Sequence, residues 1–411
     1  MKWGFRCTML SFLFSFLACA SGSEAEGVAV AGCDGCAADS AELQASDEDA
    51  QGVSAGDILA KLEVASASPS DVELADSDLM PVAGDSEGRT EEEKSEDDIV
   101  APDVEQGSGK LPAYPLDDLL RLNHIQMKGT HNSYHIAPSD WTLEDWSYTH
   151  APLYEQLESQ GVRQIELDVH YEGDDGFAVF HLPVIDEATT CDFFTECLGE
   201  VRAWSDSNPG HHPVFILVEP KDDFDIQKIN GHYQELEAEI LSVFPLERVI
   251  TPDFVRGEYP NLREGLEAQG WPTLGEVRGM VIFVMLDSGS HRERYLELYP
   301  DLKGALIFAR GGYGESYGAV LEYGSNDEMT KAVNEGYLLR GNADDLDKSD
   351  ADNEAMAAAA LSKGAHFIST DFSDNSVEGF SFSIPGGQPS RCNPITAPPE
   401  CSAEAVENLQ P

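Results

Sequence analysis

Basic residues are scarce in this chain of 411 residues, because 25 lysines and arginines stand against 76 aspartates and glutamates, a net charge of −51. Residues 20–110 carry 24 acidic and 4 basic side chains, and residues 111–411 carry 52 and 19, so both parts are acidic. Such a surface repels nucleic acid and is not drawn to anionic membranes. We therefore expect no nucleic-acid partner. We interpret the charge as an adaptation to solubility or salt, with the collection of cations as the alternative.

Long apolar runs are also missing, which excludes a membrane-spanning helix beyond the amino end. There, a basic start precedes the run Met9–Ala18, which is too short to span a bilayer. The sequence Phe16–Cys19 resembles a bacterial lipobox with Phe where Leu is more usual. We predict that residues 1–19 are an export signal of the lipoprotein type, which would anchor the protein at the cell envelope or outer membrane. Ordinary cleavage near Ala20, giving a secreted product, is the alternative.

Aromatic residues are few in residues 20–112, and no hydrophobic period is sustained there, so we predict a disordered acidic linker. Its CDGC sequence, with Cys33 and Cys36, lacks a second pair at zinc-site spacing, which favours a local disulfide. Two later pairs are close in sequence and suit loop disulfides in an oxidising compartment. They are Cys191 with Cys197, and Cys392 with Cys401.

Alternating strand-like and helix-like segments begin near residue 113 and continue to residue 385, followed by a C-terminal tail over 386–411. The predicted strands are His124–Lys128, Arg163–Val169, Pro213–Glu219, Gly279–Leu286, Gly304–Phe308, Tyr337–Arg340 and Ala365–Thr370, with an eighth around Val249. The predicted helices include Ala151–Gln160, Asn230–Phe244, Asp327–Asn334 and Asp350–Lys363. No Gly-rich phosphate loop follows the first strand, which argues against a doubly wound sheet. We therefore predict a closed parallel (β/α)8 barrel of the TIM type, with room for irregularity.

Polar side chains follow four of the apolar runs, in the pieces GTHNSYH at 129–135, IELDVH at 165–170, VFHLP at 179–183 and FILVEPK at 215–221. The candidate site residues in these pieces are His131, Asn132, Glu166, Asp168, His181 and Glu219. The carboxyl ends of barrel strands meet at one rim, so residues far apart in sequence can converge there. Glu166 and Asp168 are two residues apart on one strand and therefore share a face.

The oxygen atoms in this set suit a hard cation. Calcium accepts several oxygen ligands in a flexible shell, and Asn132, Glu166, Asp168 and Glu219 supply four. Cysteine is absent from the set, which argues against structural zinc. Two histidines remain beside the predicted calcium site and could serve as an acid and a base. This combination of groups suits phosphodiester cleavage.

Taken together, the pieces resemble the calcium-dependent phosphoinositide-specific phospholipase C family, most closely its bacterial secreted branch, over roughly residues 120–375. The matching features are a His-Asn pair after the first strand (His131, Asn132), a Glu-x-Asp pair on the second (Glu166, Asp168), a second histidine (His181) and a further metal-ligating glutamate (Glu219). The pieces LLRGNADD, with Arg340 and Asp344, and FISTDF, with Asp371, also resemble the bacterial branch.

The resemblance implies a calcium-dependent phosphodiesterase that cleaves phosphatidylinositol to diacylglycerol and inositol 1,2-cyclic phosphate. His181 would donate a proton to the departing glycerol oxygen as general acid. His131 would take the proton of the attacking 2-hydroxyl or stabilise the transition state as a cation, and Glu166 and Glu219 are alternative bases. Calcium would lower the pKa of that hydroxyl.

Two basic residues are candidates for contact with the substrate. Lys221 lies two residues after Glu219 and shares its face, so it could bind phosphate or pair with a carboxylate. Arg340 ends a predicted strand and could bind substrate as well. We expect a monomer whose substrate is a phospholipid at a membrane surface.

Two other functions compete with this interpretation. A glycerophosphodiester phosphodiesterase, which releases glycerol phosphate, has a similar Glu-x-Asp strand and a similarly spaced histidine. Its first strand normally ends in His-Arg, whereas this chain has His131 and Asn132, and the amide supplies a calcium ligand in place of a phosphate clamp. A catalytically inert, lipid-anchored binding module is the second alternative, although every matched position is filled.

Overall fold

The computed structural model describes residues 114–138, 146–222, 228–322, 327–374, 379–386 and 389–407. The predicted export signal, the acidic linker and the Cys33–Cys36 pair therefore lie outside the described residues. Among the described residues, no helix combines the length and the apolar character needed to cross a membrane.

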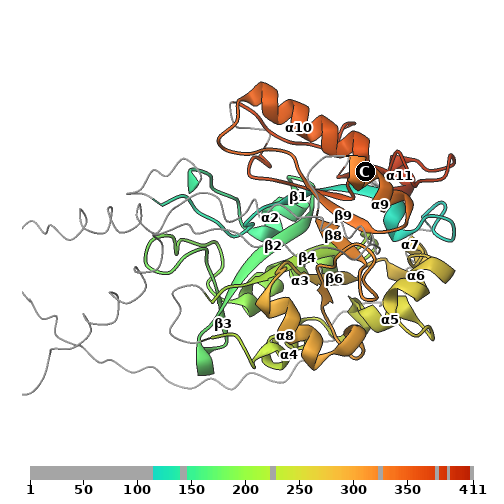
Figure 1. The fold of residues 1–411 in the computed structure, drawn as a ribbon. Coiled ribbons are helices and arrows are strands. Elements are labelled where there is room, and N and C mark those ends of the chain that lie inside the picture. Colours follow the sequence, from blue (N-terminus) through green and yellow to red (C-terminus); the bar gives the residue numbers. More distant parts are fainter. Residues whose placement is uncertain are drawn as a thin grey trace, which may run out of the picture. The chain divides into compact units, whose positions relative to one another are not determined.

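A parallel sheet forms the centre of the fold and curls into a barrel (Figure 1). Within the described ranges, its strands in spatial order are β1 (Ile125–Thr130), β2 (Val162–Tyr171), β4 (Val214–Pro220), β6 (Val281–Met285), β7 (Phe308–Ala309), β8 (Val320–Glu322), β9 (Leu338–Asn342) and β10 (Phe367–Thr370). Successive strands pair in parallel, and β10 pairs with β1. A parallel bridge between Arg310 and Val320 joins the end of β7 to β8 and completes the ring. The predicted TIM-type barrel is confirmed.

One predicted strand occupies a different place from the one expected. The strand around Val249 exists as β5 (Val249–Ile250), but it pairs only with the first two residues of β6. Farther along, the same edge of β6 pairs with β7. The remaining place in the ring belongs to β8, which the sequence analysis missed because three residues are too few to show a period.

Helices cover the outside of this sheet. The longer ones are α2 (Leu153–Glu158), α3 (Phe194–Ser207), α4 (Tyr233–Val243), α6 (Leu262–Gln269), α8 (Ser290–Leu298), α9 (Asp327–Asn334) and α10 (Asp350–Lys363). Short helices are η1 (Leu122–His124), η3 (Gly173–Asp175), η4 (Leu246–Arg248), α5 (Pro252–Arg256), α7 (Leu274–Val277), η5 (Pro300–Leu302) and α11 (Ala403–Val406). Helices α9 and α10 pack against β9, and α3 packs between α2 and α4 (Figure 1).

Local sequence explains why α10 begins and ends where it was predicted. The Ser349 side chain accepts a hydrogen bond from the backbone N–H of Asp352, which caps the first turn. Gly364 ends the helix in a left-handed conformation with φ of 90°, which glycine adopts without steric cost. The next strand, β10, starts three residues later. Single residues at the two ends therefore set the bounds of the helix.

The barrel interior is apolar at one level and polar at another. Phe215 on β4 and Phe367 on β10 belong to strands that are not neighbours, yet their ring centroids lie 4.9 Å apart across the interior. At the polar level, the Ser369 hydroxyl donates to Gln164 Oε1 and the Gln164 amide donates to the carbonyl of Thr130. Toward the carboxyl ends of the strands, these buried polar contacts give way to ionisable groups.

The C-terminal segment packs against the barrel. Strand β11 (Ser390–Cys392) pairs antiparallel with the start of β1, and a disulfide joins Cys392 to Cys401. Beyond it, the buried Glu407 accepts from Arg163 Nε at 2.7 Å and lies 3.0 Å from His212 Nε2. The other predicted disulfide, Cys191–Cys197, is also present. Both disulfides near the barrel are therefore confirmed.

Candidate active site

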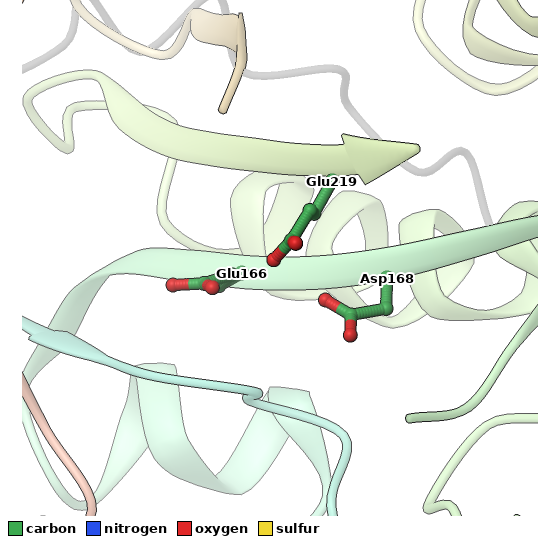
Figure 2. Close-up of side chains that lie close together, drawn as sticks. All are labelled: Glu166, Asp168 and Glu219. Carbon is green, nitrogen blue, oxygen red and sulfur yellow. The ribbon is translucent and has the colours of Figure 1, made fainter. Parts of the chain in front are cut away.

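Three carboxylates meet near the carboxyl ends of β2 and β4. Glu166 and Asp168 lie on β2, and Glu219 is the cross-strand partner of Asp168 on β4. The three side chains each offer one oxygen within 4.8 Å of the others. Figure 2 shows Glu219 reaching from its strand toward the ribbon that carries the other two. Parallel pairing of the two strands thus builds an acidic cluster, defined here as Glu166, Asp168 and Glu219.

Two basic side chains offset part of the charge of the acidic cluster. Lys221 Nζ lies 2.5 Å from Glu219 Oε1 and 3.2 Å from Asp168 Oδ2, and Arg340 Nη2 lies 2.5 Å from Glu166 Oε2. Burial acts to lower the pKa of Lys221, but Asp168 and Glu219 outweigh it and raise that pKa. Burial raises the pKa of Glu166 from 4.5 to about 8, although Arg340 acts to lower it. Excess negative charge is therefore held in a poorly solvated place.

The acidic cluster fits a metal ion. Asp168 is 0% exposed, and neither of its carboxylate oxygens has a hydrogen-bond partner among the described residues, although Lys221 lies within ion-pair distance. A buried carboxylate without such partners is costly, and a divalent cation would satisfy it. Calcium prefers several carboxylate and amide oxygens, which is the chemistry of this set.

Asn132 is the second residue after β1 and has a left-handed backbone conformation with φ of 39°, which asparagine tolerates better than most residues. Its side chain is buried, and the Tyr134 hydroxyl donates to its Oδ1 at 3.4 Å. Burial, and then the charge of Asp168, raise the pKa of Tyr134 well above 10, so the hydroxyl keeps its proton. Tyr134 therefore contacts Asn132 and is close enough to the acidic cluster to be affected by the charge of Asp168. A bond from Asn132 to the metal stays a prediction.

His131 is held between two carboxylates. Its Nδ1 lies 3.0 Å from Asp371 Oδ1, and its Nε2 lies 4.0 Å from Glu166 Oε1. Asp344 in turn accepts from the backbone N–H of Asp371 at 2.9 Å, and burial together with Asp371 raises the pKa of Asp344 to about 7. Because a carboxylate only accepts hydrogen bonds, Nδ1 of His131 carries a proton. Its Nε2 then faces the acidic cluster.

His181 reaches the site from a hairpin. Strand β3 (Phe177–Val179) pairs antiparallel with the end of β2, with Val179 opposite Val169, so the chain returns toward the barrel before His181. The imidazole is 18% exposed, and its Nδ1 lies 2.8 Å from Oδ2 of the buried Asp186. This contact places a proton on Nδ1 and leaves Nε2 as the atom that can exchange a proton with a ligand.

A row of rings links the two histidines predicted to be catalytic. The ring centroids of His131 and Tyr148 are 6.2 Å apart, those of Tyr148 and His135 are 4.4 Å apart, and those of His135 and His181 are 6.2 Å apart. Ring contacts through the buried Tyr148 and His135 therefore connect His131 to His181. His131 in turn lies 4.0 Å from Glu166 of the acidic cluster.

Lys221 and Arg340, the two candidates for contact with substrate, form ion pairs with the acidic cluster. Arg340 is 2% exposed, donates to Ser369 Oγ at 3.0 Å and also pairs with Glu322. Lys221 is more open, with a side chain that is 17% exposed. Lys221 was predicted either to bind phosphate or to pair with a carboxylate, and the pairing with carboxylates is present. Contact of either residue with substrate stays a prediction.

Sequence reasoning missed two residues that shape this region. Asp186 lies between His181 and His135, and Tyr148 packs against both His131 and His135. Asp186 follows His181 by five residues in a short loop, but no period or recurrent spacing distinguishes it from other aspartates in an acidic chain. Tyr148 belongs to a segment without regular secondary structure, so its inward position depends on the tertiary fold.

Comparisons with known proteins agree with this arrangement. The chain matches the family model described as "Phosphoinositide phospholipase C, Ca2+-dependent" over residues 120–176 and 173–394. The matched region contains the acidic cluster and both histidines. No curated protein matches the chain.

Solved structures give a likeness of fold. A calcium-dependent phosphoinositol-specific phospholipase C from the Gram-negative bacterium Pseudomonas sp. has a TM-score of 0.50 and 19% identity, over 68% of this chain and 97% of that one. A Ca2+-dependent phosphatidylinositol-specific phospholipase C from Streptomyces antibioticus has a TM-score of 0.47 and 18% identity, over 62% of this chain and 95% of that one.

Proposed function

The chain belongs to the Ca2+-dependent phosphoinositide phospholipase C family, and on that basis we propose that it cleaves phosphatidylinositol to diacylglycerol and inositol 1,2-cyclic phosphate. It is a phospholipase C-like enzyme of a calcium-dependent family, and its acidic cluster could hold that metal. One observation carries the proposal for the reaction. Two imidazoles, His131 and His181, each have Nδ1 within 3.0 Å of a carboxylate, and Nε2 of His131 lies 4.0 Å from Glu166 of the acidic cluster.

In this reaction, the inositol 2-hydroxyl attacks the adjacent phosphorus while the bond from phosphorus to the glycerol oxygen breaks. His131 Nε2 takes the proton of the hydroxyl, because Asp371 holds the other nitrogen in its protonated form. Protonated His181 gives the proton on Nε2 to the departing glycerol oxygen, which leaves as diacylglycerol. One proton is taken up and one is released, so the enzyme returns to its starting state after the two histidines exchange protons with solvent.

Glu166, Asp168, Glu219 and Asn132 would hold calcium beside these histidines. When bound, the ion lowers the pKa of the attacking hydroxyl and balances charge on the phosphoryl oxygens. Arg340 pairs with the buried Glu166 and opposes the rise that burial causes in its pKa. Lys221 offsets the charge of Asp168 and Glu219 and is open enough to contact a phosphate oxygen.

The proposal extends to the setting of the enzyme. The substrate is a phospholipid, so the enzyme works at a membrane surface, and we expect it to act there as a monomer. Residues 1–19 direct export from a bacterial cytoplasm, and lipidation at Cys19 keeps the barrel at the cell envelope on the acidic linker. Incorporation of labelled palmitate, lost in a Cys19→Ala variant, tests the anchor.

The function is tested with the purified protein on phosphatidylinositol, with calcium or with chelator. We expect cyclic inositol phosphate only with calcium. Glycerophosphoinositol is the second substrate, and release of glycerol phosphate from it would favour the glycerophosphodiesterase instead.

The acid is tested with His181→Ala, which we expect to slow phosphatidylinositol cleavage by about 10²–10⁴-fold. An inositol phosphodiester with an aryl leaving group needs no proton, so its turnover should fall far less. His232→Ala, at a histidine whose ring stacks on Tyr171, is the matched control. Equal losses on both substrates would refute the role of His181 as acid.

A further inference from the structure

His135 is buried between two hydrogen-bond acceptors. Its Nδ1 lies 3.0 Å from the carbonyl oxygen of Tyr148, and its Nε2 lies 3.1 and 3.0 Å from the two oxygens of Asp186. The residue is 1% exposed, so water cannot replace either partner. A carbonyl and a carboxylate accept but do not donate, so both ring nitrogens must carry a proton. An imidazole with two N–H groups is a cation.

If Asp186 were protonated, it could donate a hydrogen bond to His135, and the ring would not need a proton on both nitrogens. The surroundings of Asp186 argue against this. Its Oδ2 also faces His181 Nδ1 at 2.8 Å, so two N–H groups converge on one buried carboxyl group. Burial acts to raise the pKa of Asp186, but the hydrogen bonds with His135 and His181 outweigh it and lower that pKa. Asp186 is therefore ionised, and the cation is His135.

We propose that His135 is a positively charged positioning residue that shares Asp186 with His181 and thereby keeps His181 a strong acid. The proposal rests on the proposed function, in which His181 donates the proton. Asp186 alone would fix the His181 ring but would also bind its proton tightly, since an unpaired buried carboxylate strongly stabilises a neighbouring imidazolium. The charge on His135 cancels much of that effect and keeps the orientation.

The groups that face this pair come from two segments. Tyr148 packs on the His135 ring from the segment after residue 145, and the backbone N–H of His150 donates to the His135 carbonyl. Asp186 and His181 come from the loop after β3, and Trp146 lies edge-on to the His181 ring at 5.4 Å. Among these, Asp186 carries the negative charge in contact with both imidazoles.

Nuclear magnetic resonance of the ¹⁵N-histidine-labelled protein in chelator tests the charge without any assay of activity. We expect both ring nitrogens of His135 to carry a proton at neutral pH, because each faces an acceptor. A ring that carries one proton at that pH would overturn the proposal. This readout needs no variant, so a failure to fold cannot obscure it.

The effect on His181 is tested by the pH profile of kcat/KM on phosphatidylinositol. In His135→Gln, the amide can still donate to Asp186 but carries no charge, and we expect the alkaline limb to move up by about one pH unit. In Asp186→Asn, the limb should move down, and cleavage should slow on the order of 10²-fold while the aryl substrate is largely spared. A structural defect would lower the turnover of both substrates together and would not move the alkaline limb in opposite directions in the two variants.

The possible failures are distinguishable. If the wild-type enzyme cleaves no phosphatidylinositol, the proposed function is wrong, and the resonance measurement still decides the charge of His135. If the wild-type enzyme is active but the two variants leave the alkaline limb in place, the shared-aspartate proposal is wrong and the proposed function stands.

Discussion

Replacement of Asp168 by asparagine should show separately what this carboxylate costs in stability when no metal is bound and what it contributes when calcium is bound. Asp168 is fully buried and its carboxylate oxygens lack hydrogen-bond partners among the described residues. A buried polar group without partners costs about 1–3 kcal/mol, and more when it is charged. The variant removes the charge and relieves repulsion with the neighbouring carboxylates, but its amide stays buried and it loses the ion pair with Lys221. Because Lys221 keeps its contact with Glu219, we expect a net gain of about 1 kcal/mol in chelator.

Calcium should make the wild type more stable than Asp168→Asn, which is the reverse of the order expected in chelator. At 100 times its Kd, a bound ion stabilises the wild type by about 2.7 kcal/mol. A folded unit of roughly 290 residues unfolds with an entropy of about 0.6 kcal/mol/K, so each kcal/mol moves Tm by about 1.6 °C. Calcium should therefore raise the wild-type Tm by about 4 °C. In Asp168→Asn, the starting Tm should be about 1–2 °C higher, and most of the calcium increment should disappear.

Differential scanning calorimetry with calcium and with chelator measures both quantities. Glu247→Gln, which removes one charge at an exposed position, is the matched control and should keep the wild-type calcium increment. A variant that melts several degrees lower in chelator would show that Asp168 stabilises the empty site. A variant that keeps the calcium increment would show that Asp168 is not a ligand. Either result would refute the reasoning.

Two further predictions concern parts of the fold outside the acidic cluster. In Glu407→Gln, Arg163 and His212 lose a buried counter-charge, and urea unfolding at pH 7 should show a loss of about 3–5 kcal/mol. Burial acts to raise the pKa of Glu407, but Arg163 and His212 lower it overall. The stabilisation by ionised Glu407 is therefore complete above about pH 4.3 and decreases below it. The difference in unfolding free energy between the wild type and Glu407→Gln should accordingly be smaller at about pH 3. An unchanged difference would contradict the ion pair. In Gly129→Ala, the new Cβ would collide with Gln164 Oε1, and a loss of about 1–3 kcal/mol should be partly restored by Gln164→Ala.

The sequence was sufficient to predict the barrel because its longest segments carry strong local signals. The continuous apolar run of β4, buried on both faces, predicts a parallel strand, and the caps at Ser349 and Gly364 locate α10. Strands of two or three residues, such as β7 and β8, have no detectable period. Their places depend on pairing with neighbours, and pairing is a property of the closed sheet.

The sequence also predicted which side chains form the acidic cluster, since Glu166 and Asp168 share a face of one strand and Glu219 ends the next parallel strand along the sheet. Only the tertiary structure decided how those charges are balanced. Arg340 arrives from β9, Lys221 turns toward two carboxylates, and Asp186 joins His181 to His135. The physical reason is that the two features depend on different distances along the chain. Which side chains share a face of a strand depends on residues next to each other in sequence. The partner of a buried charge depends on which distant segments the fold brings within about 3 Å of it.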